Sequence, residues 1–216
     1  RPKSSAASDV YKRQASTWGE ITGSPGVCVS TRGPGAANMV NGVAHAWMDR
    51  APLIAINDQY PGATLATGMR QVMNQHALFA PITKWQTTIH AKSVRQQIRR
   101  AIRVTTSPTP GPVQFDMPSN ETMSEAGETV AEAPLLPNIV PIEPDRNALK
   151  VPLQALSTAR KPILLAGLGV FWDKASAVLV ALAERLGAPV LTTSKCKGAI
   201  PEDHPLRAGC VIGGII

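Results

Sequence analysis

The motif with the clearest chemical meaning in this sequence is Arg32-Gly33-Pro34-Gly35, which stands between an expected strand and an expected helix. Glycines on both sides of a proline form a sharp turn, where the backbone can approach a flat or large molecule closely. Ligands of parallel sheets bind at the edge where the strands end. The motif therefore predicts a ligand-binding turn, and a plain strand–helix junction remains the alternative from the pattern alone.

Two other features of the sequence are candidate binding elements. The helix expected after the turn carries one polar stripe, formed by Asn38, Asn41, His45 and Asp49. Gly167-Leu168-Gly169 also follows a strand and precedes a helix, but the third glycine of a dinucleotide fingerprint would fall at Trp172. This second motif predicts a tight turn, with contact to a ligand phosphate as the alternative.

The remaining reactive residue types form no recognisable site. No two histidines have metal-ligand spacing on one helix face, and no Ser or Cys stands in a nucleophile elbow. The three cysteines lack a C-x-x-C pattern, which argues against a zinc site or a disulfide framework and favours a reducing cytoplasm. We therefore predict no metal site in the chain.

Strands alternate with helices in two parts of the sequence, and this order indicates parallel sheets of the α/β class. The first part contains expected strands at 26–31, 52–57, 85–90 and 112–116, and expected helices at 36–49 and 91–106. The second part contains expected helices at 146–159 and 174–186, and expected strands at 163–166 and 189–193. We expect two α/β domains, the second with too few strands to close a sheet.

A stretch rich in proline and glutamate separates the two parts, and it predicts an interdomain linker at 119–145. The resulting domains are 15–118 and 146–216. Residues 1–14 show neither periodicity nor an apolar face, so we expect them to be disordered or foreign to the natural protein. With 44% hydrophobic and 17% charged residues, the 216-residue chain as a whole has a globular composition.

The net charge of +7 raises the question of nucleic-acid binding. Positive charges without an Asp or Glu among them run from Lys84 to Arg103, and all but Lys84 lie on the expected amphipathic helix at 91–106. No stacking aromatics stand among its arginines, and acidic residues follow from Asp116 on. The longest apolar stretch, 162–172, is far shorter than the roughly 20 residues of a membrane span. We predict no nucleic-acid partner, no membrane partner and a cytoplasmic location.

The segment from Gly26 to Gly62, GVCVSTRGPGAANMVNGVAHAWMDRAPLIAINDQYPG, resembles the pyrimidine-binding (PYR) domain of thiamine pyrophosphate (TPP) enzymes of the acetolactate synthase group. FAPITKW and TPGPVQFDMPS match the same domain. KPILLAGLGV and LGAPVLTTSKCKGAIPEDHP are similar to the start of the family's central domain. The similarity runs from about Ala15 to about Gly209 and implies two Rossmann-like domains, of which the PYR domain lacks its first part and the central domain is truncated.

The resemblance implies a fragment of a TPP-dependent 2-oxo acid decarboxylase or carboligase, a lyase or transferase. In this family the TPP ylid attacks the 2-oxo acid, carbon dioxide leaves, and the enamine passes to an acceptor. Carried over to this chain, Gly33, Pro34 and Gly35 would lie against the aminopyrimidine ring of TPP. Asn38 would lie near it, and Gln59 and Gln71 match glutamines that face the active site.

The chain departs from the family at its start. The family's catalytic Glu should fall near Ser8, so we expect no catalytic residue in this chain. The segment SAASDVYKRQ (5–14) resembles adapter read-through in translated environmental assemblies, which favours a spliced-on end over a lost catalyst.

Other departures concern cofactors and assembly. Thr109 stands where many acetolactate synthases carry an arginine that contacts FAD, which leaves FAD open but argues against it. The diphosphate-binding domain, with its Mg²⁺ ligands, is not in this sequence. Because family active sites form between subunits, the resemblance implies a homodimer or homotetramer through the PYR domain and an inactive isolated fragment.

Two alternatives stay open. One is another TPP lyase, of benzoylformate or oxalyl-CoA decarboxylase type. The other is a non-catalytic nucleotide-binding or regulatory module that kept the fold. A Glu in the true upstream sequence would separate enzyme from module, and the identity of the 2-oxo acid does not follow from this segment.

Overall fold

The computed structural model describes residues 5–67, 70–127 and 143–211, with only the backbone described for residues 5–12. The chain divides into two compact units between Ile139 and Val140. This division falls inside the range 119–145, of which residues 128–142 lie outside the described part. The domain bounds given above stay a prediction.

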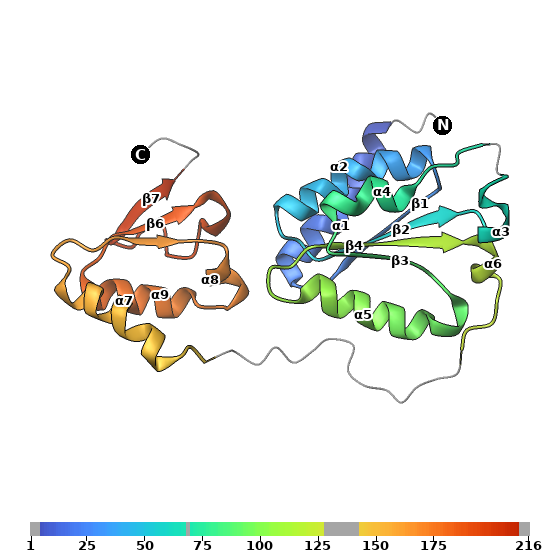
Figure 1. Ribbon diagram of the computed structural model, residues 1–216. Helices are drawn as coiled ribbons and strands as arrows, with labels where there is room; N and C mark the ends of the chain where they lie inside the picture. The colour runs from blue at the N-terminus through green and yellow to red at the C-terminus, as the bar shows by residue number, and fades with distance from the viewer. Residues whose placement is uncertain (1–4, 68–69, 128–142, 212–216) are drawn as a thin grey trace. The chain divides into compact units, whose positions relative to one another are not determined.

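The first unit is built on a four-stranded parallel sheet with the order β1-β2-β4-β3 (Figure 1). Its strands are β1 (Gly26–Ser30), β2 (Leu53–Gln59), β3 (Trp85–Thr88) and β4 (Pro112–Pro118). All three strand pairs are parallel. The α/β class and the parallel sheet predicted from the sequence are confirmed.

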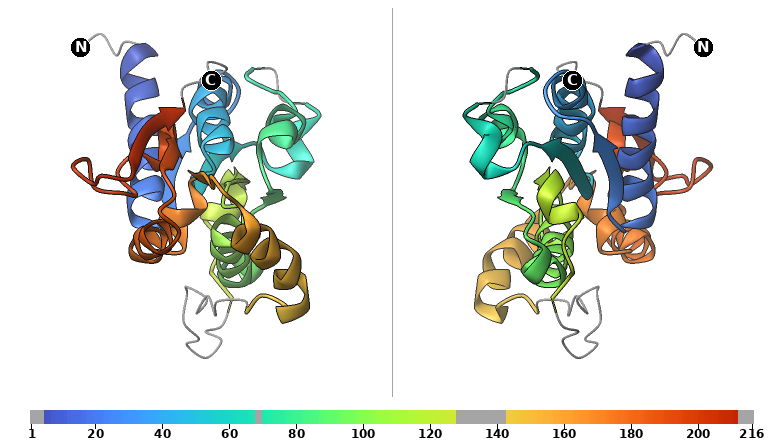
Figure 2. Two further views of the ribbon diagram at one scale, coloured as in Figure 1. Left: turned by 90° about the vertical axis from the view of Figure 1, so that its left-hand side faces the viewer. Right: turned by 90° about the vertical axis from the view of Figure 1, so that its right-hand side faces the viewer.

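Helices cover both faces of this sheet. α1 (Ser5–Thr22), α2 (Pro34–Met48) and the short α4 (Gln75–Phe79) lie on one face, and α5 (Val94–Thr106) lies on the other (Figure 1). α1 and α2 pack beside each other, as both views of Figure 2 also show. Short helical turns complete the unit: α3 (Gly62–Leu65), η1 (Ala80–Ile82), η2 (Ala91–Ser93) and α6 (Ser119–Thr122).

The alternation of side chains along β2 and β4 supplies a core on each face of the sheet. Leu53 and Ala55 pack with Met39 and Val43 of α2 on one side. On the other side, Ile54 packs with Val113 and Phe115 of β4 and with α5. Because both faces are covered, β2 begins with a continuous apolar run from Leu53 to Ile56, as is typical of parallel sheets, whereas β4 alternates and buries Gln114 and Asp116.

α5 confirms the predicted amphipathic helix. Val94, Ile98 and Ala101 pack into the core, whereas Arg95 and Arg103 are exposed. A further arginine, Arg100, stacks over the Trp85 ring at 4.6 Å from its centroid. The arginines of α5 thus form a solvated face with one aromatic contact to the protein itself.

Thr105 links the last turn of α5 to two strands and offers a test of the packing. Its buried hydroxyl accepts a hydrogen bond from the Leu53 N–H at 3.0 Å and donates to the Gly111 carbonyl at 2.5 Å. Thr105→Val should lower the free energy of unfolding by about 1.5 kcal/mol, because it leaves buried polar groups unpaired. Urea denaturation measures the change. Thr106→Val is the matched control, since Thr106 bonds only the Ile102 carbonyl of its own helix, and an equal loss in both variants would contradict this account.

The second unit contains a three-stranded parallel sheet with the order β5-β6-β7. Its elements are α7 (Arg146–Thr158), β5 (Leu164–Ala166), α8 (Gly169–Trp172), α9 (Ser176–Leu186), β6 (Val190–Thr193), η3 (Ser194–Cys196) and β7 (Arg207–Val211). β7 was not predicted, because Arg207 and Gly209 interrupt its apolar pattern and Gly209 has a φ of 114°. A register shift at Val190/Leu191 accompanies this glycine.

Cys196 is fully buried in the core of the second unit, among Ala166, Val190 and Ile200. Burial raises the pKa of its thiol, so the reactive thiolate is scarce at neutral pH. In the folded chain we expect Cys196 to react with a disulfide reagent much more slowly than the partly buried Cys210, and at the same rate once urea unfolds both. The C196S variant assigns the slow phase, and a fast native reaction lost in that variant would refute the prediction.

The structure corrects several local expectations. Residues 1–14 were expected to be foreign to the natural protein or disordered; from Ser5 to Thr22 the backbone is one helix, which speaks against disorder from Ser5 on and leaves a foreign origin as a prediction. α2 begins at Pro34, not at residue 36, because proline suits the first helical position. β2 extends to Gln59, and the expected linker begins with the four-residue helical turn α6. Among the described residues, no helix combines the length and the apolar character that crossing a membrane requires.

Candidate functional site

The predicted turn lies at the carboxyl edge of the first sheet. Gly33 has φ 60° and ψ −113°, a conformation that residues with a Cβ adopt only with strain. An added Cβ would stand 2.7 Å from the Gln71 carbonyl oxygen and 2.8 Å from the Gln71 Cβ. Glycine is therefore required at position 33 for two reasons, its φ and the close approach of the segment around Gln71.

An ion pair fixes this turn to the end of the neighbouring strand. The Arg32 Nε donates to Asp58 Oδ2 at 2.8 Å, and a terminal guanidinium nitrogen of Arg32 also lies 2.8 Å from that oxygen. The guanidinium stacks over Tyr60 at 4.0 Å from the ring centroid. The turn after β1 and the end of β2 are thus held together by one partly buried arginine.

A buried polar network lies under the same edge, centred on Asp116. Asp116 Oδ1 accepts hydrogen bonds from the side-chain amides of Gln75, at 2.9 Å, and Gln114, at 2.8 Å. The Gln114 amide also donates to Asn57 Oδ1, and Asn57 donates to Ser30 Oγ at 2.7 Å. These hydrogen bonds connect β4, β2 and β1 toward their carboxyl ends. Because the network is buried, where the dielectric constant is low, the loss of one of its side chains weakens the remaining hydrogen bonds.

A cleft of about 430 Å³ opens beyond the ends of β2, β3 and β4. Its walls include Gln59, Met73, Gln75, His76 and Asp116. Within the described chain, the buried Gln75 Oε1 and His76 Nε2 have no hydrogen-bond partner. His76 Nε2 lies 3.5 Å from Asp116 Oδ2, within ion-pair distance but without a hydrogen bond. Buried polar atoms of this kind normally find partners, so the cleft suits a polar ligand.

The structure brings some of the predicted site residues together. Gly33 contacts Gln71, and Gln59 is buried at the end of the adjacent strand and lines the cleft. The Gln59 Oε1 accepts the N–H of Tyr60 at 2.9 Å. Pro34 and Asn38 are exposed on the first two turns of α2 and do not line the cleft.

Three residues of this edge escaped the sequence analysis: Gln75, His76 and Asp116. Asp116 carried a signal, because it directly follows the apolar residues of an expected strand, where ligand groups of parallel sheets stand. Gln75 and His76 lie on the short α4, which has no periodicity to detect. Ser8 lies in α1, where only the backbone is described, and the expected absence of a catalytic Glu stays a prediction.

Thr109, the position compared with the arginine that contacts FAD, has a φ of 54°. Its carbonyl accepts a hydrogen bond from Lys84 Nζ at 3.0 Å. Thr109 therefore serves a local turn between α5 and β4.

Comparison with known proteins gives this edge a family context. The family model of the thiamine pyrophosphate enzyme N-terminal TPP-binding domain matches residues 13–78, and that of the thiamine pyrophosphate enzyme central domain matches residues 149–215. The first match contains Gly33, Gln59 and Gln71. The two models occur in the order of the two structural units.

Individual relatives cover most of the chain. The chain is 35% identical over 202 residues to a probable acetolactate synthase large subunit of Methanocaldococcus jannaschii, and this match covers 91% of the chain and 34% of the relative. It is 32% identical over 212 residues to a probable 2-ketoarginine decarboxylase of Pseudomonas aeruginosa, covering 93% of this chain and 36% of that protein. The chain spans about a third of the length of the curated relatives it matches.

A solved structure agrees with these matches. The thiamine diphosphate-dependent 4-hydroxybenzoylformate decarboxylase of Rhodococcus jostii superposes with a TM-score of 0.79 at 25% identity, over 94% of this chain and 39% of that one. The two domain models, the relatives at 32–35% identity and this shared fold agree with the resemblance seen in the sequence: the chain belongs to the thiamine pyrophosphate enzyme family.

Proposed function

We propose that this chain is part of a TPP-dependent 2-oxo acid decarboxylase or carboligase of the acetolactate synthase type. The similarity to acetolactate synthase large subunits along nine-tenths of the chain supports this proposal. Since the chain spans about a third of those relatives, the activity is that of a longer protein containing this chain.

The observation that carries the proposal is the glycine turn at the carboxyl edge of the sheet. Gly33-Pro34-Gly35 would hold the aminopyrimidine of TPP, with Asn38 near the ring and Gln59 and Gln71 beside it. The unpartnered Gln75 Oε1 and His76 Nε2 of the adjoining cleft suit a ligand with polar groups. When bound, TPP supplies the carbanion chemistry that 2-oxo acid decarboxylation needs.

The chain's own contribution is to bind and to position. Arg32 and Asp58 keep the turn closed onto β2, and the network around Asp116 keeps the polar floor of the cleft in place. Because these contacts lie within the chain itself, they would lower the cost of ordering the site around the cofactor.

The proposal includes the setting of the whole protein. The whole protein would use Mg²⁺ held by ligands outside this chain, act in the cytoplasm and assemble as a homodimer or homotetramer through the PYR domain. FAD is left out of the proposal, because Thr109 occupies the position compared with the FAD-contacting arginine.

A decarboxylase without carboligase activity is the second candidate. The solved 4-hydroxybenzoylformate decarboxylase and the probable 2-ketoarginine decarboxylase favour it, since both are similar to nearly the whole chain. A non-catalytic module of the same fold is the third, and it differs from both in lacking the upstream Glu.

Product analysis separates the three candidates. The full-length protein encoded around this chain is incubated with pyruvate, TPP and Mg²⁺, and in parallel with an aromatic 2-oxo acid. Acetolactate from pyruvate, formed only with TPP, is the expected result. An aldehyde as sole product from either substrate would favour the decarboxylase. No TPP-dependent release of carbon dioxide, with Glu missing about eighteen residues before Gly26, would favour the module.

A further inference from the structure

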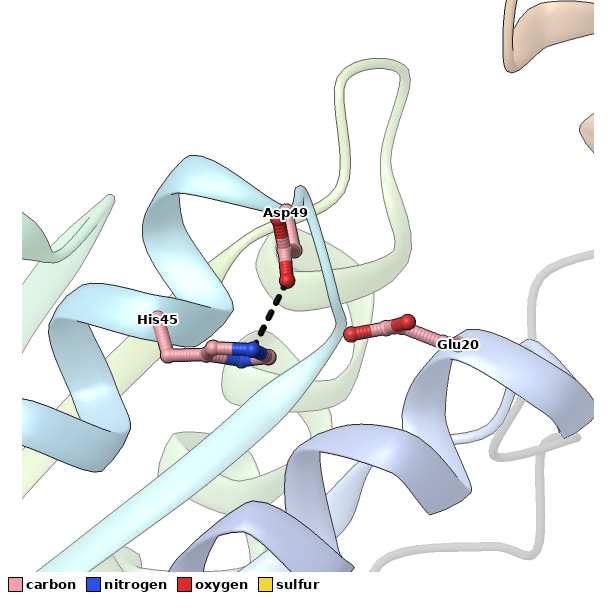
Figure 3. A group of neighbouring side chains, drawn as sticks. All are labelled: Glu20, His45 and Asp49. Atoms are coloured by element: carbon pink, nitrogen blue, oxygen red, sulfur yellow. Dashed lines mark ion pairs between the residues drawn. The ribbon is translucent and has the colours of Figure 1, made fainter. Parts of the chain in front are cut away.

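A second group of polar side chains lies at the opposite end of α2 from the glycine turn. Glu20 of α1, His45 of α2 and Asp49, the residue directly after α2, face one another (Figure 3). The His45 Nε2 lies 3.0 Å from Asp49 Oδ2, and one ligand atom from each of the three residues lies within 4.8 Å of the others. In the described part of the chain, this is the only such group of three.

The spacing of these residues follows from helix geometry. His45 and Asp49 are four positions apart and therefore share one face of the helix. Glu20 belongs to the last turn of α1, which packs beside α2. No metal site was predicted from the sequence, because neither the histidine spacing nor the cysteine pattern indicated one, whereas here the neighbours of a single histidine are carboxylates from two separate parts of the chain.

A fourth residue sets the orientation of the imidazole. Ser16 of α1 is fully buried, and its hydroxyl lies 3.4 Å from His45 Nδ1. A proton on Nδ1 can be donated to this hydroxyl, which leaves Nε2 with a free lone pair on the side of Asp49. Metal-ligating histidines are oriented in this way by a partner on the other ring nitrogen.

The distances suit an ion of the zinc class. At metal–ligand distances of about 2.0–2.1 Å, ligand atoms at neighbouring corners of a tetrahedron stand about 3.3 Å apart. The 3.0 Å between His45 Nε2 and Asp49 Oδ2 is close to that value. The Glu20 side chain is exposed and can rotate toward the same point, and imidazole with carboxylates is a donor set for Zn²⁺.

We propose that Glu20, His45 and Asp49 form a binding site for a divalent transition-metal ion of the Zn²⁺ type, with water completing the coordination. The ion joins α1 to α2. Glu20 and Asp49 have further interactions within the chain, with which the ion competes. His45 stands twelve positions after Gly33, roughly 18 Å along the helix axis, which separates this site from the proposed cofactor edge.

The competing explanation is a simple ion pair between protonated His45 and Asp49, as forms on many helix surfaces. That pair needs neither Glu20 nor Ser16. His204 provides a matched comparison, because its Nε2 lies 3.4 Å from Glu184 Oε1 but the two residues belong to no group of three in the described chain.

The test is calorimetric titration of ZnCl2 into the untagged chain, with Co²⁺ absorption in the visible range as a coordination signature. The wild type should bind one saturable ion and show a higher Tm with Zn²⁺. E20Q, H45N and D49N should each weaken binding at least tenfold, and H204N should bind as the wild type does.

Circular dichroism of each variant checks the fold, and the exposed position of Glu20 makes E20Q the decisive variant. Absence of saturable Zn²⁺ binding to the wild type would overturn the proposal. So would binding that survives E20Q unchanged, since Glu20 would then not be a ligand of the ion.

Discussion

Gly33→Ala is expected to lower the free energy of unfolding of the chain by about 3–4 kcal/mol. Two effects combine at this position. Alanine at φ 60° with ψ −113° costs about 1–2 kcal/mol in backbone strain. Its Cβ would also stand 2.7 Å from the Gln71 carbonyl oxygen, so the segment around Gln71 has to move. Urea denaturation followed by circular dichroism measures the loss.

Two other glycines separate these effects. Gly23 has a φ of 69° and open space around its Cβ position, so Gly23→Ala should show the strain alone, about 1 kcal/mol. Gly62 has open space and no positive φ, and Gly62→Ala should leave the stability nearly unchanged. If Gly33→Ala lowers the free energy of unfolding no more than Gly23→Ala does, Gln71 does not approach the turn as closely as the structure shows.

Asp116→Ala should destabilise the chain by about 3 kcal/mol. The substitution removes the acceptor of two buried side-chain amides, those of Gln75 and Gln114, and opens a gap at the floor of the cleft. Hydrogen bonds to a charged acceptor contribute about 1.5–3 kcal/mol each, and part of the loss is recovered because each amide keeps a second partner.

Asp116→Asn is the matched control. The asparagine Oδ1 can accept both amide hydrogen bonds, and its Nδ2 would take the place of Asp116 Oδ2, 3.5 Å from His76 Nε2, to which it can donate. We expect this variant to lose at most about 1 kcal/mol. Equal losses in both variants would show that the negative charge, and not the hydrogen-bond pattern, stabilises this edge.

Much of the fold could be predicted from local patterns. The β-branched and apolar runs of β1 and β2, the alternating residues of β4 and the periodicity of α5 each predict the element that the structure shows. The first part of α1 lacked such a pattern, and β7 is interrupted by Arg207 and Gly209. Helix and strand formation there depends on neighbours that the local sequence does not reveal.

The candidate site divides in the same way. Gly33 was predicted because a strand, a glycine-proline turn and a helix follow one another directly. Its contact with Gln71 and the bond from Gln75 to Asp116 join residues about 40 positions apart, which no periodicity encodes. The group of Glu20 and His45 likewise depends on how α1 packs on α2. Gln59 and Gln71 were identified as candidate site residues by the resemblance to the family, whereas Gln75 and His76 were identified only from the structure.

Hydrogen–deuterium exchange of the full-length protein, with and without Mg²⁺ and TPP, tests the central claim most directly. The account predicts slower exchange on TPP addition in peptides covering residues 31–38, 58–60 and 70–76, and unchanged exchange around β6 and β7. Bound TPP that leaves the amides of Gly33 and Gly35 unprotected would contradict the proposed cofactor edge.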